Sequence, residues 1–219
     1  MDTLKIIDLH SHSFMSDGIA TPTELIRYAQ IADYSVFSIT DHVDLTNYKQ
    51  VIDSVLKLKD INFYPLLFIP GIEITHVHPD NISTIVDYAR KMGIKWIGVH
   101  GETPVEPVIK GTNIAAIEAR VNFLAHPGFI TNTELKLAVK NNVWIELTMR
   151  GGHSLTNGYV YSKGKNIDVN FIISSDSHKP SDLFNLKKYT STALGSGMTE
   201  EEFLFHNKNL WKYVLSELV

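Results

Sequence analysis

Short apolar segments alternate along the chain with longer segments in which apolar residues recur every three or four positions. The short segments are rich in Ile, Val, Leu and Phe, as in Phe171-Ile172-Ile173. Nearly continuous apolar runs of this length are typical of strands that are covered on both faces. We expect strands at residues 4–9, 35–40, 66–74, 95–99, 121–125, 143–147 and 169–174.

The longer segments carry the start and stop signals of helices. Thr21-Pro22-Thr23-Glu24 provides a threonine cap, a proline in the first turn and a glutamate three residues after the cap. Gly93 is typical of a residue just beyond the end of a helix. Helices are expected at residues 21–33, 46–59, 79–92, 113–119, 131–141, 153–164 and 199–218.

This alternation predicts parallel strands joined by helical crossovers. Such strands form either a closed barrel or an open sheet with helices on both faces. The chain of 219 residues shows no linker, low-complexity segment or internal repeat. We therefore expect a single domain over residues 1–219.

Side chains suited to metal binding follow nearly all the expected strands. His10 and His12 lie two positions apart after the first strand, so both imidazoles point to one face of an extended segment. The other residues of this kind are His42, Glu73, His100, His126, Asp176 and His178. Any one of them alone is equally well explained as a structural residue, but the set indicates a site. Because such barrels carry their active sites where the strands end, the pattern predicts a metal centre at that rim.

The composition limits which metals the chain could bind and which partners it could have. The chain has no cysteine, so imidazole and carboxylate must hold any metal, which suits Zn, Mn or Fe. The formal net charge of −4 offers no basic field to nucleic acid. The first residues lack the pattern of a signal peptide, and no apolar run approaches the ~20 residues of a membrane span. We therefore expect a cytoplasmic protein without membrane contact.

In their order along the chain, these residues resemble the signature of the PHP domain, a family named for polymerase and histidinol phosphatase. The matching segments are Asp8-Leu9-His10-Ser11-His12 with Asp17-Gly18, Thr40-Asp41-His42, Gly71-Ile72-Glu73, Val99-His100, Ala125-His126-Pro127 and Ser175-Asp176-Ser177-His178. The resemblance runs from about residue 6 to residue 180. It implies an α/β fold, a distorted (β/α)7 barrel of parallel strands with its active site at the C-terminal face, and hydrolysis of phosphate esters.

The resemblance also implies ligands for two or three divalent metal ions. One ion would be held by His10, His12, Glu73 and Asp176. Glu73 would bridge to a second ion held by His100 and His126, and a third would be held by Asp17, His42 and His178. Asp17 stands where some relatives have histidine, so the third position is expected to differ in affinity or metal preference.

Arg150 and His153 follow the sixth strand on the same rim and are the candidates for contact with substrate. Arg150 fits a bidentate grip on phosphate oxygens or a salt bridge with Glu146. His153 fits a general acid or simply the first residue of a helix. Glu102 is interpreted as either a partner of a cationic substrate group or a solvated side chain. The remaining candidates are interpreted as exposed or rim residues with no part in the chemistry, and they are Lys179, His76, His78 and His206.

Together these features predict a metal-dependent phosphoric monoester hydrolase that acts on a small phosphorylated substrate by attack of a metal-bound hydroxide. Histidinol phosphate is the first substrate to consider. The short chain leaves little room for inserted elements around a substrate, so a nucleotide or nucleoside-bisphosphate phosphatase is an alternative. Similar barrels also hydrolyse amide or cyclic bonds, and a non-catalytic PHP module is a further possibility that the intact ligand set opposes. The oligomeric state is left open.

Overall fold

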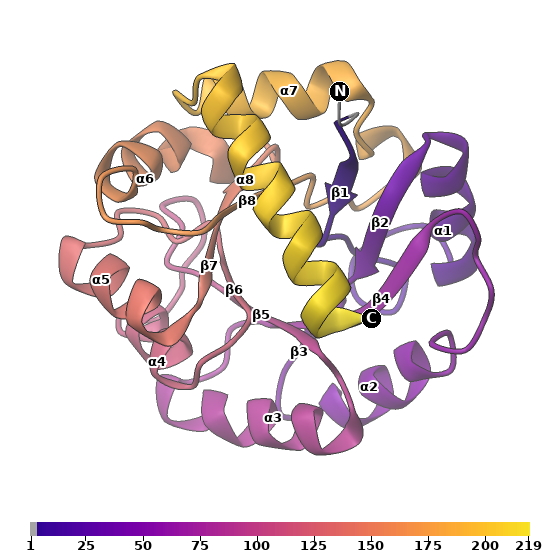
Figure 1. Ribbon diagram of the computed structural model, residues 1–219. Coiled ribbons are helices and arrows are strands. Elements are labelled where there is room, and N and C mark those ends of the chain that lie inside the picture. Colours follow the sequence, from indigo (N-terminus) through magenta and orange to yellow (C-terminus); the bar gives the residue numbers. More distant parts are fainter. Residues whose placement is uncertain (1–3) are drawn as a thin grey trace.

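The computed structural model describes residues 4–219 and consists of a parallel sheet rolled into a barrel and surrounded by helices (Figure 1). Strands follow one another around the barrel in the order β1-β2-β4-β5-β6-β7-β8, and the short β3 pairs with β4. Every recorded pairing is parallel. The strands are β1 (Ile6–Asp8), β2 (Tyr34–Ile39), β3 (His42–Val43), β4 (Leu67–Ile74), β5 (Trp96–His100), β6 (Phe123–Ala125), β7 (Trp144–Thr148) and β8 (Phe171–Ser174). The predicted distorted β/α barrel is confirmed.

The barrel closes between its first and last strands just beyond their C-terminal ends. The segments after β1 and β8 form an isolated parallel bridge at Ser11 and Ser177. His12 N donates to Ser177 O at 2.8 Å, and Asp176 N donates to His10 O at 3.0 Å. Backbone hydrogen bonds therefore hold together the two segments that carry four of the predicted ligands.

The helices surround the barrel and agree with most of the sequence expectations. Capping boxes begin three of them, at Thr21, Thr131 and Thr199, and Gly93 ends α3 with a φ of 99°. The helices are α1 (Pro22–Ile31), α2 (Tyr48–Leu56), α3 (Pro79–Met92), α4 (Thr112–Glu118), α5 (Asn132–Asn141), α6 (Asn157–Gly164), α7 (Leu186–Gly195) and α8 (Glu200–Tyr213). Across residues 4–219, no helix has the length and apolarity needed to cross a membrane.

One helix was not expected, and two expected helices include a turn of another helical type. Helix α7 was not predicted, because its sequence buries little more than Tyr189 and Ala193 and shows no clear apolar stripe. The helix expected over residues 199–218 is confirmed, with Thr199 as its cap; its last turn, Val214–Leu218, is a π turn that continues α8. The expected helix at residues 153–164 begins as a 3-10 turn, His153–Thr156, before α6.

An apolar plug fills the barrel from its N-terminal end. It consists of Ile7, Leu9, Val36, Ile69, Trp96, Phe123, Ala125, Trp144 and Ile172, together with Leu210, Val214 and Leu218 from the C-terminal helical segment. Trp96 stacks on Phe123 with ring centroids 5.0 Å apart, and its Nε1 donates to Leu9 O at 2.7 Å. A second apolar layer packs the strands against the outer helices.

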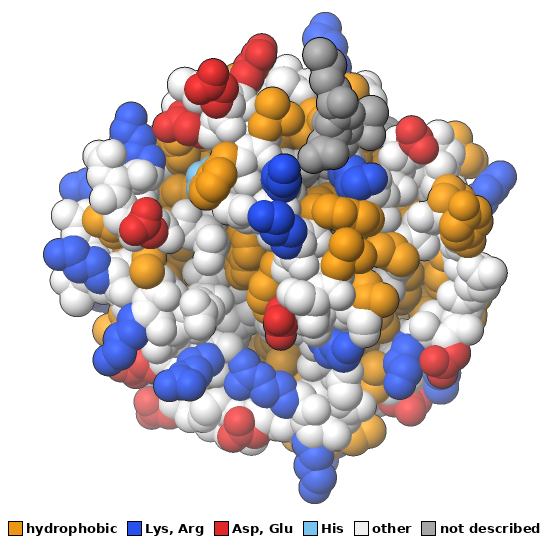
Figure 2. Space-filling view, in the orientation of Figure 1, with side chains coloured by type: hydrophobic (Ala, Val, Ile, Leu, Met, Phe, Trp, Pro, Cys, Tyr) orange, Lys and Arg blue, Asp and Glu red, His pale blue; other side chains and the backbone are white. Residues whose placement is uncertain are grey.

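Helix α8 covers this end of the barrel. Asn207 Nδ2 donates to the carbonyl of Lys5, which precedes β1, at 2.8 Å, and Tyr213 Oη lies 3.1 Å from Asn122 Nδ2, just before β6. The helix crosses the front of the barrel in Figure 1, and the same face in Figure 2 shows apolar and charged side chains but little histidine. Most histidines of the chain gather at the opposite, C-terminal end.

Candidate metal centre

The strand ends bring all nine residues of the predicted ligand set to one rim. His10 and His12 lie in the extended segment after β1, His42 begins β3, Glu73 is near the end of β4, and His100 ends β5. His126 follows β6, and both Asp176 and His178 follow β8. The ninth residue, Asp17, is supplied by the loop after β1. Because the strands are parallel, residues far apart in the chain meet at this edge.

Glu73 lies at the centre of the cluster and is fully buried. Among the described residues, neither of its carboxylate oxygens accepts a hydrogen bond of good geometry. Imidazole nitrogens nevertheless surround it: His42 Nδ1 lies 2.9 Å and His10 Nε2 3.3 Å from Oε2, and His126 Nε2 lies 3.6 Å from Oε1. A buried carboxylate without hydrogen bonds is costly unless a cation compensates it, so this arrangement fits bound metal.

A first donor group surrounds the two histidines after β1. His10 Nε2 and His12 Nε2 are 3.0 Å apart, and Asp176 Oδ1 lies 3.2 Å from His12 Nε2. Glu73 Oε2 is 3.6 Å from His12 Nε2. Ligand atoms that share one metal at about 2.1 Å lie about 3.0–3.4 Å from one another. The His10–His12 and His12–Asp176 separations suit a single divalent ion, and the Glu73 oxygen lies just outside this range.

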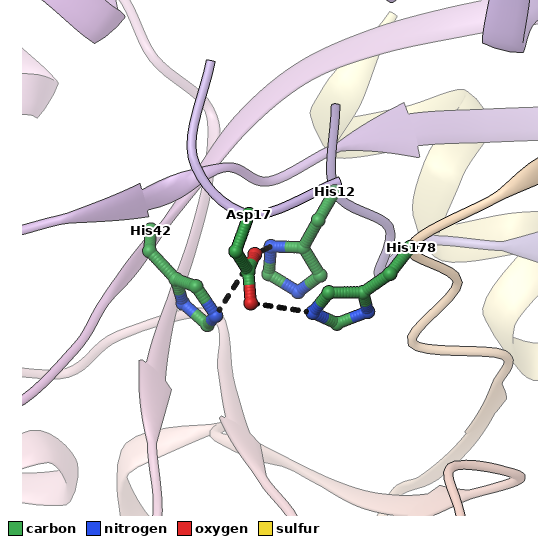
Figure 3. A group of neighbouring side chains, drawn as sticks. All are labelled: His12, Asp17, His42 and His178. Carbon is green, nitrogen blue, oxygen red and sulfur yellow. Dashed lines mark ion pairs between the residues drawn. The ribbon is translucent and has the colours of Figure 1, made fainter. Parts of the chain in front are cut away.

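A second donor group contains Asp17 and the histidines nearest to it (Figure 3). Asp17 Oδ2 lies 3.0 Å from His178 Nε2, and Asp17 Oδ1 lies 3.5 Å from His42 Nε2 and 3.9 Å from His12 Nδ1. In Figure 3 the three rings converge on the carboxylate from three separate segments. Aspartate at this position therefore lies among the donors with which the sequence grouped it.

A third donor group joins His100, His126 and His153. The rings of His126 and His153 are stacked with centroids 4.2 Å apart, and the centroid of His100 is 4.3 Å from that of His126. His153 is buried and begins the 3-10 turn before α6, so it is a helix-start residue whose ring also faces the site. Its proposed acid role stays a prediction.

Hydrogen bonds on Nδ1 leave Nε2 of several histidines free to bind metal. His10 Nδ1 donates to Glu146 Oε1 at 2.5 Å, His100 Nδ1 to Gly101 O at 3.2 Å, and His178 Nδ1 to Asp176 O at 3.0 Å. His42 Nδ1 donates to Thr75 Oγ1 at 2.6 Å. An acceptor on one ring nitrogen fixes the tautomer that presents the other lone pair, as in most metal-binding histidines.

The backbone is strained at two of the ligand positions. His126 has a φ of 25° and Asp176 a φ of 50°, the left-handed region that L residues rarely occupy. Each residue lies within two positions of the end of its strand. Backbone conformations of this kind persist where the surrounding structure holds them and concentrate at functional sites.

Burial and mutual charge divide the histidines into two classes. Burial and neighbouring imidazoles hold the pKa of His12 and of His126 well below the ordinary value, so both are neutral at neutral pH. Burial lowers the pKa of His42, but Glu73 and Asp17 outweigh it and raise that pKa to about 10. Burial and nearby carboxylates raise the pKa of Asp176 to about 7. A proton on His42 therefore supplies positive charge that the neighbouring carboxylates favour.

Glu146 supports two donor groups at once, a role that the sequence reasoning missed. It is fully buried; its Oε1 accepts from His10 Nδ1 and from Ser174 Oγ, and its Oε2 accepts from His126 N at 2.7 Å. A glutamate within the apolar run of β7 was the available signal, but the sequence suggested it only as a partner of Arg150. That salt bridge is absent from the described residues, since Arg150 pairs with Asp182 at 3.8 Å.

The rim outside the cluster differs from several other expectations. Glu102 is partly exposed, and its Oε1 accepts from Gly111 N at 2.9 Å and Asn113 N at 3.0 Å at the start of α4, a contact that the sequence did not suggest. His206 is half-buried with its ring against Phe171, whereas we expected it to be exposed. Exposure was correct for Lys179 and His78.

His76 and Glu106 lie next to each other on this rim. His76 is half-exposed, as expected, but its Nε2 lies 3.5 Å from Glu106 Oε2. Glu106 also contacts His100 and His153, and no motif or spacing in the sequence pointed to it. This residue therefore joins the cluster only through the path of its loop.

Comparisons with known proteins agree with the geometry. The model of the PHP domain family matches residues 8–169. The uncharacterized protein MJ1295 of Methanocaldococcus jannaschii is 36% identical over 215 residues, which cover 94% of this chain and 99% of that protein. The relationship to this archaeal protein therefore extends over almost the full length of both chains.

Two solved structures illustrate the range of proteins with this fold. Histidinol phosphate phosphatase from Lactococcus lactis, determined with zinc, L-histidinol and phosphate, is 14% identical with a TM-score of 0.58, covering 90% of this chain and 95% of that one. The N6-mAMP deaminase of Arabidopsis is 9% identical with a TM-score of 0.61, covering 98% and 94%. At these identities the likeness concerns the fold alone.

Proposed function

We propose, since this chain belongs to the PHP domain family, that it is a metal-dependent hydrolase whose substrate is a small phosphomonoester. The observation that carries the proposal is the buried Glu73 carboxylate, which accepts no hydrogen bond from the described residues while imidazoles from three separate segments surround it. Family membership and the donor groups support the metal-dependent hydrolase. The phosphomonoester is the finer part of the proposal.

The residues present fit two or three divalent ions. We assign the first ion to His10, His12, Glu73 and Asp176, the second to Glu73, His100 and His126, and the third to Asp17, His42 and His178. Zinc, manganese and iron all suit this set of nitrogen and oxygen donors. When bound, such ions lower the pKa of a coordinated water and offset charge on phosphoryl oxygens.

The chain itself orients and shields this centre. Glu146 fixes the tautomer of His10 and holds the backbone of His126, so two donor groups keep their spacing. The apolar plug below, with Phe123 5.3 Å from the His10 ring, excludes water from the inner side of the cluster. Substrate must therefore approach from the outer, C-terminal side.

Arg150 and His153 are proposed to act on the substrate side. The Arg150 side chain is 36% exposed, and its weak contact with Asp182 at 3.8 Å leaves its guanidinium able to exchange partners for phosphate oxygens. Burial and the positive charge of His100 lower the pKa of His153, so the neutral imidazole can accept a proton or coordinate metal. Both residues would therefore act between the metal centre and the substrate.

The decisive experiment measures metal and substrate together. Purified protein is analysed for bound metal and then assayed with para-nitrophenyl phosphate, histidinol phosphate, nucleotides, a nucleoside bisphosphate, amide substrates and an N6-substituted adenine nucleotide. We expect phosphate release that chelation abolishes and Mn or Zn restores. Hydrolysis of the amide or N6-substituted substrates without phosphate release would contradict the phosphomonoester assignment and favour the chemistry of other barrels of this shape. A protein without bound metal or metal-dependent turnover would overturn the hydrolase.

A further inference from the structure

A carboxylate outside the assigned ligand set faces the second metal position. Glu106 lies in the loop between β5 and α4. Its Oε2 is 3.1 Å from His100 Nε2 and 3.5 Å from His76 Nε2, and its Oε1 is 3.3 Å from His153 Nε2. Three imidazoles from three different segments therefore direct their Nε2 atoms at a single side chain.

The ring nitrogens that face Glu106 are free to bind metal. His100 uses its Nδ1 on the carbonyl of Gly101, and His153 Nδ1 lies 2.9 Å from Thr103 Oγ1. Both residues also belong to the donor group that includes His126. Glu106 thus extends an existing cluster toward solvent and does not form a separate surface pair.

We propose that Glu106 is a further ligand of the second divalent ion, which it would hold together with Glu73, His100 and His126, with His153 as an additional donor beside it. The proposal rests on the proposed function, since it presumes that this ion is bound. Oxygen and nitrogen atoms on one ion at about 2.1 Å are separated by about 3.0–3.4 Å. Glu106 Oε2 lies 3.1 Å from His100 Nε2 and Oε1 lies 3.3 Å from His153 Nε2, so the carboxylate would bind the ion through both oxygens. A carboxylate also reduces the net positive charge that neutral imidazoles leave on the ion.

The loop that carries Glu106 is anchored on both sides. On one side, Glu102 accepts the backbone N–H groups of Gly111 and Asn113, and its own N donates to Asn113 Oδ1 at 2.9 Å. On the other, Asn113 Nδ2 donates to Pro127 O, and a side chain on Gly128 would collide with the carbonyl oxygen of Glu102. The close approach of this loop to the segment after β6 requires glycine at position 128. The position of Glu106 is therefore built into the fold.

His76 provides an independent sign of a constructed site. It follows β4 with a φ of 54°, a left-handed conformation that is unfavourable for a histidine. Its ring centroid lies 5.4 Å from that of His100, and its Nε2 faces the same oxygen of Glu106. In this arrangement His76 positions the Glu106 carboxylate over the ion.

The test compares metal binding by the wild type and three variants. Glu106→Gln keeps the size of the side chain but removes the anionic donor, Glu106→His supplies a nitrogen donor, and Glu118→Gln makes the same change in α4, outside the donor groups. Zinc content is measured after dialysis, zinc affinity by competition with a chelator, and the coordination of cobalt by its visible absorption. Circular dichroism checks that each variant is folded.

We expect Glu106→Gln to lower the affinity for one of the bound ions by about 10- to 100-fold and to change the visible spectrum of bound cobalt. The affinity for the other ions should stay the same. Glu106→His should recover most of the affinity, which a mere ion pair with His100 would not do, and Glu118→Gln should match the wild type. If the wild type holds its ions and Glu106→Gln holds them equally tightly, the inference fails and the proposed function stands. If the wild type holds no divalent ion, both fail.

Discussion

The two ends of the barrel are built from the same strands but differ in what they bury, apolar side chains at one end and polar donor groups at the other. At the N-terminal end, α8 packs on an apolar plug that includes Trp96 and Phe123, and the buried Trp96 Nε1 donates to Leu9 O. At the C-terminal end, fully buried polar atoms of Glu73, His12 and His126 have no hydrogen-bond partner among the described residues. One end therefore stabilises the fold by apolar packing, and the other keeps buried polar groups that are costly without a compensating charge.

The largest expected effect lies at the polar end. His12→Ala and Asp176→Ala should each lower turnover by on the order of 10,000-fold, because donors that act as a unit fail together. The thermal stability of the metal-free protein should change little, since burial disfavours the charged forms of both side chains and their removal relieves that cost. Phosphate release and a melting curve measure the two properties. Wild-type turnover in both variants would remove these residues from the reaction.

A substitution at the apolar end should give the opposite result. Trp96→Ala removes a fully buried ring and a hydrogen bond and should lower the free energy of unfolding by about 3–5 kcal/mol. The number of metal ions bound by the folded protein should not change. Chemical denaturation and elemental analysis test this, with Phe205→Ala, a 61% exposed aromatic residue, as the control. Loss of metal from folded Trp96→Ala would mean that the two ends are not independent.

Glu146 supports two donor groups of the metal centre, and its substitution should have an intermediate effect. Glu146→Gln preserves size but weakens acceptance from His10 Nδ1, and we expect metal affinity to fall by about 10- to 100-fold. Ser174→Ala is the control, because it removes another partner of Glu146 and leaves the carboxylate in place. Chelator competition provides the measurement. Equal losses in both variants would show that general packing, and not the orientation of His10, is responsible.

The pH dependence of stability should distinguish the metal-free from the metal-loaded protein. Glu73 and Asp17 raise the pKa of His42 to about 10 from 6.5, so between these values the folded state binds more protons than the unfolded state. The free energy of unfolding of the metal-free protein should therefore fall as the pH rises from about 6.5 to 10. Bound metal replaces that proton and should remove the decline. Melting temperatures with and without chelator measure the difference, and identical pH profiles would contradict it.

The smallest expected effect is that of Arg150 on substrate binding. Arg150→Ala should raise KM for phosphorylated substrates by roughly 10-fold, about the size of one charge-assisted hydrogen bond, and should leave kcat and metal content nearly unchanged. Steady-state kinetics on the best substrate of the panel measures this. Lys179→Ala, which removes the other cation near Asp182, is the matched control. An unaltered KM would make Arg150 a structural partner of Asp182 alone.

The order of residues along the chain was enough to predict much of the fold and the region of the candidate site. The alternation of apolar runs with periodic segments predicted seven strands of the barrel and most of its helices, because local pattern reflects which faces are buried. Donors at successive strand ends predicted that the ligand candidates would meet, since parallel strands deliver their ends to one rim. The two-residue strand β3 and helix α7 were missed because neither has a clear apolar period of its own.

What the sequence by itself determined is the type and placement of the donors: histidine and carboxylate, without cysteine, after the strands of a barrel. Only the tertiary structure decided which groups meet. Glu146 became the support of His10, Glu102 a helix cap and Glu106 a neighbour of three histidines, because loop paths and inward-facing strand positions set distances that spacing along the chain does not encode. A contact between residues many positions apart depends on how the whole chain packs, whereas a strand depends mainly on its own pattern.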